Sequence, residues 1–162
     1  MKRIVIVEDR PWKMRSCIKE LQSKGITFYK TIYYRNNSLD TKTQEELLNQ
    51  YIEDTGMEIE RVNSQEEFVS KMDDAYQVSD TIFLMDYDLK GDMNREDFFT
   101  RVNVRYALAR DKERIWFYTT GPSDIKGILL DTFPDHVISV KVTDNMQGFW
   151  DEEQIRAAVQ TG

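Results

Sequence analysis

Cysteine and histidine are almost absent from this chain, which has one of each among 162 residues. A single cysteine, Cys17, excludes an internal disulfide and indicates a reducing compartment, which we expect to be the cytoplasm. Cys17 falls on the apolar face of a predicted helix, which favours a buried structural thiol over a nucleophile. His136 stands at the start of a predicted strand, where a structural or surface role is favoured over catalysis.

Long apolar runs and a surplus of basic residues are also missing. The apolar run at the N-terminus covers only residues 4–7 before it reaches an acid at Glu8, which is too short for a signal-peptide core or a membrane span. Lys and Arg number 22 against 29 for Asp and Glu, so the formal charge is −7. An acidic domain binds nucleic acid poorly, and it suits Mg²⁺ or a basic protein surface better.

The chain nevertheless has the composition of a folded domain. Hydrophobic residues make up 40% and aromatic residues 12% of the sequence, which predicts a packed core rather than disorder. A length of 162 residues suits one domain of ordinary size. No repeat or low-complexity tract divides the chain, so we expect a single domain over residues 1–162.

Short apolar runs alternate with segments of helical periodicity along the whole chain. The predicted strands cover residues 4–7, 57–62, 82–85, 115–118 and 137–140, with a further candidate at 26–34. The predicted helices begin near residues 11, 43, 64, 94, 123 and 151, the second and third at the capping boxes Thr43-x-x-Glu46 and Ser64-x-x-Glu67. Strands that alternate with helices imply right-handed crossovers and a parallel sheet covered on both faces.

Polar side chains follow the predicted strands at the points where they end. The residues are Glu8, Asp9, Asp86, Thr119 and Lys141, and ligands of open α/β sheets bind at the carboxyl ends of the strands. Two or three carboxylates at one edge attract a hard cation such as Mg²⁺. A carboxylate can also act as a nucleophile toward phosphorus, while a lysine and a hydroxyl hold the phosphoryl oxygens.

Taken in order, these segments resemble the receiver domain of two-component response regulators. The matching pieces are Ile-Val-Ile-Val-Glu8-Asp9, Glu58-Ile-Glu-Arg-Val62, Ile82-Phe-Leu-Met-Asp86-Tyr-Asp88-Leu-Lys-Gly91, Trp116-Phe-Tyr-Thr119-Thr120 and Ile138-Ser-Val-Lys141. The resemblance implies a flavodoxin-like α/β fold, a doubly wound five-stranded parallel sheet in the order 2-1-3-4-5. Residues 26–56 would be an insertion that adds a strand and a helix at the sheet's open edge, outside the strand at 57–62. The competing assignment makes 26–34 the second strand and 57–76 the insertion; we prefer the first because 57–76 leads into the Asp86 strand with the family's usual spacing.

The resemblance also implies a signalling switch of a phosphorelay rather than an enzyme, assisting only its own phosphotransfer and dephosphorylation. Asp86 would be phosphorylated by a histidine kinase or a phosphotransfer protein, and the chain would act through a downstream protein partner. Lys141 would pair with the phosphoryl group, and Thr119 would hydrogen-bond it and reorient. No direct contact with nucleic acid is expected.

The cofactor implied by the resemblance is Mg²⁺. The carboxylates of Asp9 and Asp86 and the carbonyl of Asp88 would hold it, with Glu8 nearby or bound through water. The sequence departs from the family at Val142, where a proline usually follows the lysine, and at Ile138, where an aromatic residue is usual.

Two other functions remain open on the sequence. The departures at Ile138 and Val142 are compatible with a pseudo-receiver, an interaction module that keeps the fold without phosphorylation. Asp86-Tyr-Asp88 after an apolar strand also fits phosphatases of the haloacid dehalogenase type. Against the phosphatase, only 76 residues follow Asp86 (162 minus 86), and Glu8 and Asp9 would have no role.

Overall fold

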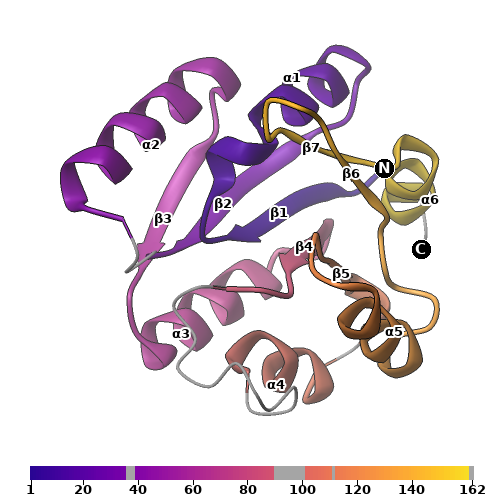
Figure 1. The fold of residues 1–162 in the computed structure, drawn as a ribbon. Coiled ribbons are helices and arrows are strands. Elements are labelled where there is room, and N and C mark those ends of the chain that lie inside the picture. The colour runs from indigo at the N-terminus through magenta and orange to yellow at the C-terminus, as the bar shows by residue number, and fades with distance from the viewer. Residues whose placement is uncertain (36–38, 90–100, 111, 161–162) are drawn as a thin grey trace.

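Five parallel strands form the central sheet of this protein. In the computed structural model, which describes residues 1–35, 39–89, 101–110 and 112–160, the strands lie in the order β3-β2-β1-β4-β5 (Figure 1). Their bounds are Arg3–Glu8 for β1, Phe28–Tyr34 for β2, Glu58–Val62 for β3, Thr81–Asp86 for β4 and Ile115–Tyr118 for β5. The α/β class and the parallel sheet predicted from the sequence are therefore confirmed.

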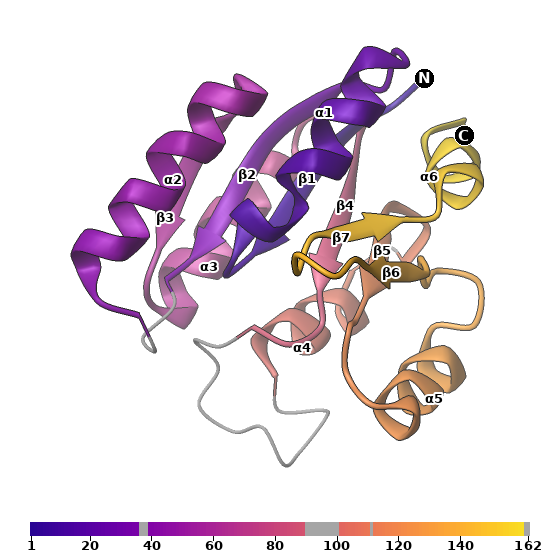
Figure 2. The same ribbon diagram turned by 45° about the horizontal axis from the view of Figure 1, so that its top comes forward.

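Helices cover both faces of the sheet (Figures 1 and 2). One face carries the short 3-10 helix η1 (Pro11–Met14), α1 (Arg15–Ser23), α2 (Thr41–Thr55) and α6 (Glu152–Gln160). The other carries α3 (Gln65–Tyr76), α4 (Val102–Leu108) and α5 (Ser123–Thr132), and a second 3-10 helix, η3 (Lys112–Arg114), leads into β5. Among the described residues, no helix is both long enough and apolar enough to cross a membrane.

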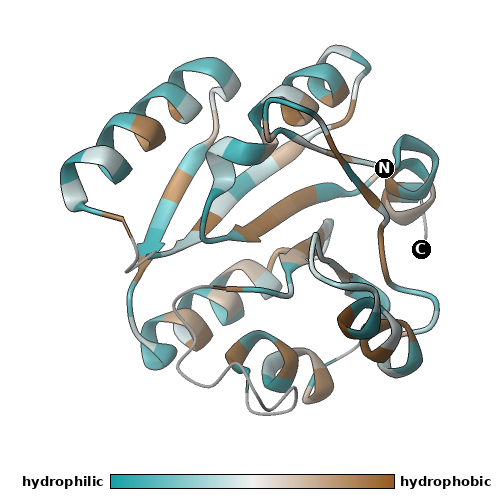
Figure 3. Cartoon of the chain, viewed as in Figure 1, coloured by the Kyte–Doolittle hydropathy of each residue, from teal (hydrophilic) through white to brown (hydrophobic). Residues whose placement is uncertain are grey.

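The two faces are separated by the period of two along each strand. In β1, Ile4 and Ile6 belong to the core under α1 and α6, while Val5 and Val7 belong to the core over α3 and α4. All four are fully buried, and the hydropathy colouring shows the apolar stretch of β1 in the middle of the sheet (Figure 3). A strand that is apolar on both faces is what a doubly covered parallel sheet requires.

Local signals place most helix ends as expected. Ser64 caps α3 by accepting a hydrogen bond from the backbone N–H of Glu67, as its capping box predicts. In α2 the cap is Asp40, which accepts from the N–H of Thr43 at 2.8 Å, so the helix begins before the predicted box. Cys17 is buried, and burial raises the pKa of its thiol to about 11, in agreement with a structural role.

The predicted strand order is wrong in one respect, because β2 lies inside the sheet. Phe28–Tyr34 pairs with β1 on one side and with β3 on the other, and Glu58–Val62 is the edge strand. Burial explains the exchange: β2 brings Thr31 and Ile32 at 0% exposure, whereas three of the five residues of β3 are charged, which an edge strand tolerates. The strand at 28–34 is therefore an interior strand beside β1, as in the competing assignment, and the preferred assignment of an edge insertion is wrong.

The last predicted strand, residues 137–140, is also corrected. Only Val137 pairs with the sheet, through an isolated parallel bridge to Phe117 beyond the β5 edge. The chain then forms an antiparallel hairpin of β6 (Val140–Val142) and β7 (Gly148–Trp150) over the face that carries η1 and α1. The predicted helix at 94–109 is described only from α4 onward, and its start at Asn94, like the Lys90-Gly91 turn, lies outside the described residues.

Candidate functional site

Three neighbouring strands end in polar residues whose side chains emerge on the same face of the sheet. Glu8, Asp86 and Tyr118 are the last residues of β1, β4 and β5, and Asp86 is the direct partner of Tyr118 in the β4–β5 register. Since side chains alternate along a strand, each lies on the face of the residue two positions earlier, which belongs to the core beneath η1, α1 and α6. Alternation therefore gathers these groups at one place.

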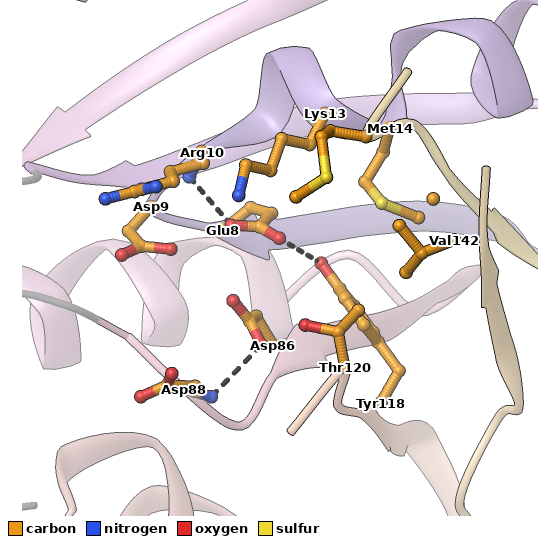
Figure 4. Close-up of a pocket in the computed structure, with 12 residues that line it drawn as sticks. Glu8, Asp9, Arg10, Lys13, Met14, Asp86, Asp88, Tyr118, Thr120 and Val142 are labelled. Carbon is orange, nitrogen blue, oxygen red and sulfur yellow. Dashed lines mark hydrogen bonds between the residues drawn. The ribbon is translucent and has the colours of Figure 1, made fainter. Parts of the chain in front are cut away.

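A pocket of about 350 Å³ opens at this place (Figure 4). One end is charged and the other is apolar, with the β6–β7 hairpin forming the apolar wall. The lining residues are Glu8, Asp9, Arg10, Lys13, Met14, Asp86, Asp88, Tyr118, Thr120, Val142, Met146 and Gly148. The pocket lies at the carboxyl ends of β1 and β4, where the strand order reverses because β2 and β4 lie on opposite sides of β1. This position is the usual ligand site of a doubly wound sheet.

The charged end is a cluster of three carboxylates from Glu8, Asp9 and Asp86. One oxygen from each can be chosen so that all three lie within 4.8 Å of one another. Glu8 is 5% exposed and Asp9 is 2% exposed. Both oxygens of Glu8 are hydrogen-bonded, because Oε2 accepts from the N–H of Arg10 at 2.7 Å and Oε1 accepts from the Tyr118 hydroxyl at 2.9 Å.

Electrostatics in this cluster disfavour ionisation of Asp86. Burial, followed by the negative charges of Glu8 and Asp9, raises the pKa of Asp86 well above its ordinary value. Among the described residues, the contact that opposes this shift is the hydrogen bond that Oδ1 accepts from the N–H of Asp88 at 3.0 Å. Burial and the charges of Glu8 and Asp86 likewise raise the pKa of Tyr118, so its hydroxyl stays protonated as a donor.

The residues that follow β4 are held by the start of α4. The buried side chain of Asn103 donates hydrogen bonds to the carbonyls of Asp86 at 2.7 Å and Tyr87 at 3.0 Å. Arg101, which is 4% exposed, lies over the Tyr87 ring at 4.5 Å and places Nη1 3.6 Å from Oδ1 of Asp88. The carboxylate of Asp88 therefore faces a buried cation as well as the pocket.

The cation at the acids is not the one expected from the sequence. Lys141 is exposed on β6 and is absent from the residues that line the pocket. Alternation explains this placement, since Val142 lines the pocket and its neighbour Lys141 points to the opposite face. Lys13, in η1, lines the pocket instead, and its side chain extends toward Glu8 (Figure 4).

The two threonines after β5 also differ from expectation. Thr119 is buried, and its Oγ1 accepts a hydrogen bond from the N–H of Gly121 at 3.0 Å. Thr120, two residues after Tyr118, lines the pocket and directs its hydroxyl toward the side of Asp86 (Figure 4). The structure thus brings Glu8, Asp9, Asp86 and Asp88 together as predicted, with Thr120 and Lys13 beside them rather than Thr119 and Lys141.

The sequence contains local signals for three pocket residues that were not predicted, Tyr118, Thr120 and Lys13. Period two along β5 places Tyr118 on the face of Trp116, the same face as the strand-end acids, and Thr120 continues that pattern. Lys13 follows Pro11 in the first turn after β1. A residue this close in sequence to the end of a strand can reach a ligand that binds there. The hairpin residues Val142 and Met146 carry no comparable local signal, because their position depends on tertiary packing.

Comparisons with known proteins give no match, so the function has to be inferred from the pocket. No family model, no curated protein and no solved structure matches the chain. The oxygen donors of Glu8, Asp9 and Asp86 fit a hard divalent cation, and the position is too acidic for the pyrophosphate that binds directly after the first strand in dinucleotide-binding sheets. A carboxylate, a hydroxyl and an ammonium group around one space suit the capture of a phosphoryl group.

Proposed function

We propose that this chain is a phosphoacceptor domain in which Asp86 receives a phosphoryl group in the presence of Mg²⁺. The observation that carries the proposal is the convergence of Glu8, Asp9 and Asp86 within 4.8 Å at the carboxyl ends of β1 and β4. Such a cluster is unfavourable without a cation, because burial and mutual repulsion oppose the charged forms. Its place in the order β2-β1-β4 is that of a ligand site.

The donor set fits Mg²⁺, which prefers oxygen ligands and keeps several waters. Glu8, Asp9 and Asp86 would hold the ion, with Asp88 at the margin of the same pocket. When bound, the ion would neutralise the cluster and the charge that develops on a phosphoryl group. The resulting demand for a cation is consistent with the raised pKa of Asp86.

Asp86 is the best-placed nucleophile among these carboxylates. Its Oδ1 accepts the hydrogen bond from Asp88, whereas Oδ2 accepts none from the described residues. In the proposed reaction, a carboxylate oxygen of Asp86 forms a bond to phosphorus, and the donor's leaving group departs with the electrons of the broken bond. Lys13 and Thr120 are positioned to hold the phosphoryl oxygens.

A phosphoacceptor of this kind would work in a two-component phosphorelay. The donor would be a histidine kinase or a phosphotransfer protein, and the output would pass to a protein partner. The acidic charge of −7 supports a protein partner over nucleic acid. We place this activity in the cytoplasm, on the basis of the single cysteine.

One observation favours a second candidate, a pseudo-receiver that binds partners without phosphorylation. Lys141 is exposed and does not line the pocket, so the cation expected from the resemblance is not at the acids. We favour phosphorylation because Lys13 supplies a positive charge at the same pocket. The phosphatase alternative is weaker, since Asp88 faces the buried Arg101 at 3.6 Å instead of being free for proton transfer.

Intact-mass measurement after incubation with Mg²⁺ and acetyl phosphate tests the proposal. We expect one added phosphate in the wild-type chain and none in Asp86→Asn. Asp131→Asn is the matched control, because Asp131 is an exposed carboxylate on α5 away from the pocket. An Asp86→Asn variant that still gains the phosphate, or a wild-type chain that never does, contradicts the proposal. Steady hydrolysis of phosphate esters would instead support the phosphatase.

A further inference from the structure

The β6–β7 hairpin gives the acidic pocket an apolar wall that a phosphoryl group does not need. Val142 and Met146 of the hairpin line the pocket together with Met14 of η1. Val142 is 45% exposed and Met146 is 60% exposed, whereas Met14 is buried. The wall therefore runs from the protein core to the pocket mouth, and its outer part presents apolar surface that a ligand could cover.

The hairpin holds Met146 at the mouth against its backbone preference. Met146 has a φ of 64°, and among the described residues it is the only non-glycine residue with positive φ. Its N–H donates to the carbonyl of Thr143 at 3.0 Å, and the turn closes with the N–H of Thr143 donating to the carbonyl of Gln147 at 2.8 Å. This conformation costs roughly 1–2 kcal/mol for a residue with a side chain, and strain of this kind clusters at ligand sites.

A close approach at Gly148 fixes the wall against η1. A Cβ at this position would lie 2.7 Å from Sδ of Met14 and 3.4 Å from Cγ1 of Val140. The absence of a side chain at Gly148 thus lets β7 pack directly on the Met14 thioether. As a result the flexible thioether of Met14 forms part of a well-defined pocket surface, while that of Met146 can adapt to a ligand.

The opposite end of the pocket can hold an anion once the carboxylates hold a cation. The ammonium group of Lys13 makes no ion pair or hydrogen bond with any residue that the structure describes. The volume of about 350 Å³ lies at the lower end of the range of about 300–1,000 Å³ for small-molecule sites. Since a water molecule occupies about 30 Å³, the space exceeds what a phosphoryl group and a hydrated ion require.

We propose that this pocket binds a small organic phosphate that carries a compact apolar group, either an acyl or an aryl group. The phosphoryl end would lie between Lys13 and the carboxylates with their divalent cation, and the apolar group would lie against Met14, Val142 and Met146. This inference rests on the proposed function, because it names the ligand class of the same site. The chain would then accept phosphoryl groups from such a small molecule in addition to the protein donor, and the apolar part would select the small molecule.

Binding of two unreactive phosphonates in the presence of Mg²⁺ tests the ligand class. Methylphosphonate and phenylphosphonate share the anionic group and differ in apolar surface, and isothermal titration calorimetry gives both affinities. We expect phenylphosphonate to bind the wild-type chain about tenfold more tightly, as burial of one ring face predicts. Equal affinities, or no binding of phenylphosphonate, would overturn the inference.

Variants of the hairpin locate the preference. Met146→Gly removes the thioether and suits the positive φ, so it should fold and reduce the preference to about threefold or less. Ile128→Ala is the control, because Ile128 is 42% exposed on α5 and does not line the pocket. If Met146→Gly binds phenylphosphonate over methylphosphonate as strongly as the wild-type chain does, the proposed contact of the apolar group with the hairpin is wrong.

The outcomes separate this inference from the proposed function. Phosphonates transfer no phosphoryl group, so their binding does not depend on the reactivity of Asp86. Labelling of Asp86 by acetyl phosphate without a preference for phenylphosphonate overturns only the inference. A preference that is lost in Met146→Gly, in a chain that acetyl phosphate never labels, supports the binding site and overturns the phosphoacceptor.

Discussion

Tyr118 donates a hydrogen bond to Oε1 of Glu8 at 2.9 Å and thereby joins two strands that are not neighbours. β4 lies between β1 and β5, so the bond spans the strand that ends in Asp86. It keeps the Glu8 carboxylate close to Asp86 although the two negative charges repel. The repulsion raises the pKa of Asp86, which makes the bond a means of holding the cluster ready for a cation.

We expect Tyr118→Phe to lower the free energy of unfolding by about 1–3 kcal/mol, because it leaves a buried carboxylate oxygen without its donor. It should also weaken Mg²⁺ binding, since Glu8 would no longer be held beside Asp86. Urea unfolding with and without Mg²⁺ measures both effects.

Tyr51→Phe is the matched control for this substitution. Tyr51 is fully buried, and its hydroxyl shares a hydrogen bond of 2.8 Å with Thr31 inside the core on the same face. Its removal should destabilise the chain equally at every Mg²⁺ concentration. If Tyr118→Phe behaves in the same way, with an unchanged response to Mg²⁺, the bond from Tyr118 to Glu8 has no part in cation binding.

Asp86→Asn should make the metal-free chain more stable at neutral pH. The folded-state pKa of Asp86 is raised above the unfolded value of about 3.9, so the folded chain binds the extra proton more readily than the unfolded chain. Stability is therefore lost as the pH rises from the unfolded pKa through the folded pKa. The neutral amide removes this loss, and each kcal/mol gained raises the Tm by about 2–4 °C in a domain of this size.

Thermal unfolding across pH, with and without Mg²⁺, checks the sign. The gain in Asp86→Asn should be largest above the folded pKa, should vanish below about pH 3.9 where both states are protonated, and should shrink when Mg²⁺ is added to the wild type. Asp131→Asn should change stability little at any pH. A wild-type chain that becomes more stable as the pH rises through this window, relative to Asp86→Asn, would contradict the repulsion.

The acidic end of the site could be predicted from the sequence because local pattern determines it. Apolar runs that end in Glu8-Asp9 and in Asp86 identify buried parallel strands, and the carboxyl ends of such strands meet at one edge of the sheet. The face on which they emerge follows from period two. Both steps require only that β1 and β4 are neighbours, and neither depends on the order of the other strands.

Strand order and the hairpin could not be predicted because they depend on long-range pairing. The sequence of Phe28–Tyr34 is compatible with an edge or an interior position, and only its burial between β1 and β3 distinguishes them. Deletion of residues 27–55 would be tolerated if they formed an edge insertion, but it removes the interior strand β2, so we expect it to prevent folding. Lys141 lies away from the acids for the same reason, since β6 pairs with β7 instead of β5.

Substitution of Lys13 and of Lys141 tests which of the two lysine side chains assists phosphorylation of Asp86. Lys13→Gln should slow phosphorylation of Asp86 by acetyl phosphate about tenfold or more, because it removes one of the two positive charges that line the pocket and leaves only Arg10. Lys141→Gln should change the rate less than twofold, because the exposed side chain lies on the opposite face of β6. Rates come from intact-mass time courses at fixed Mg²⁺, and Lys13→Arg should restore part of the activity. The reverse ranking of the two glutamine variants would mean that Lys141 reaches the phosphoryl group.

Asn103 is expected to position the β4 exit through its contacts with the backbone. Its side-chain amide is fully buried and donates to the carbonyls of Asp86 and Tyr87, while its Oδ1 accepts from the N–H of Val104 at 3.0 Å. Asn103→Ala would leave these buried groups without partners, at a cost of about 1–3 kcal/mol for each. Asn103→Asp keeps the shape and the acceptor but cannot donate to either carbonyl.

The two substitutions together test whether Asn103 positions Asp86 or only stabilises the fold. Both substitutions should lower the free energy of unfolding measured in urea. Both should also reduce the phosphorylation rate, measured without denaturant at a temperature where circular dichroism shows that the variants remain folded. Asn63→Ala provides the control, because Asn63 is an exposed amide next to β3 and should change neither quantity by more than about 0.5 kcal/mol in stability or twofold in rate. Variants that lose stability but phosphorylate at the wild-type rate would show that the orientation of Asp86 does not depend on Asn103, since a merely structural residue leaves the chemistry of the folded chain unchanged.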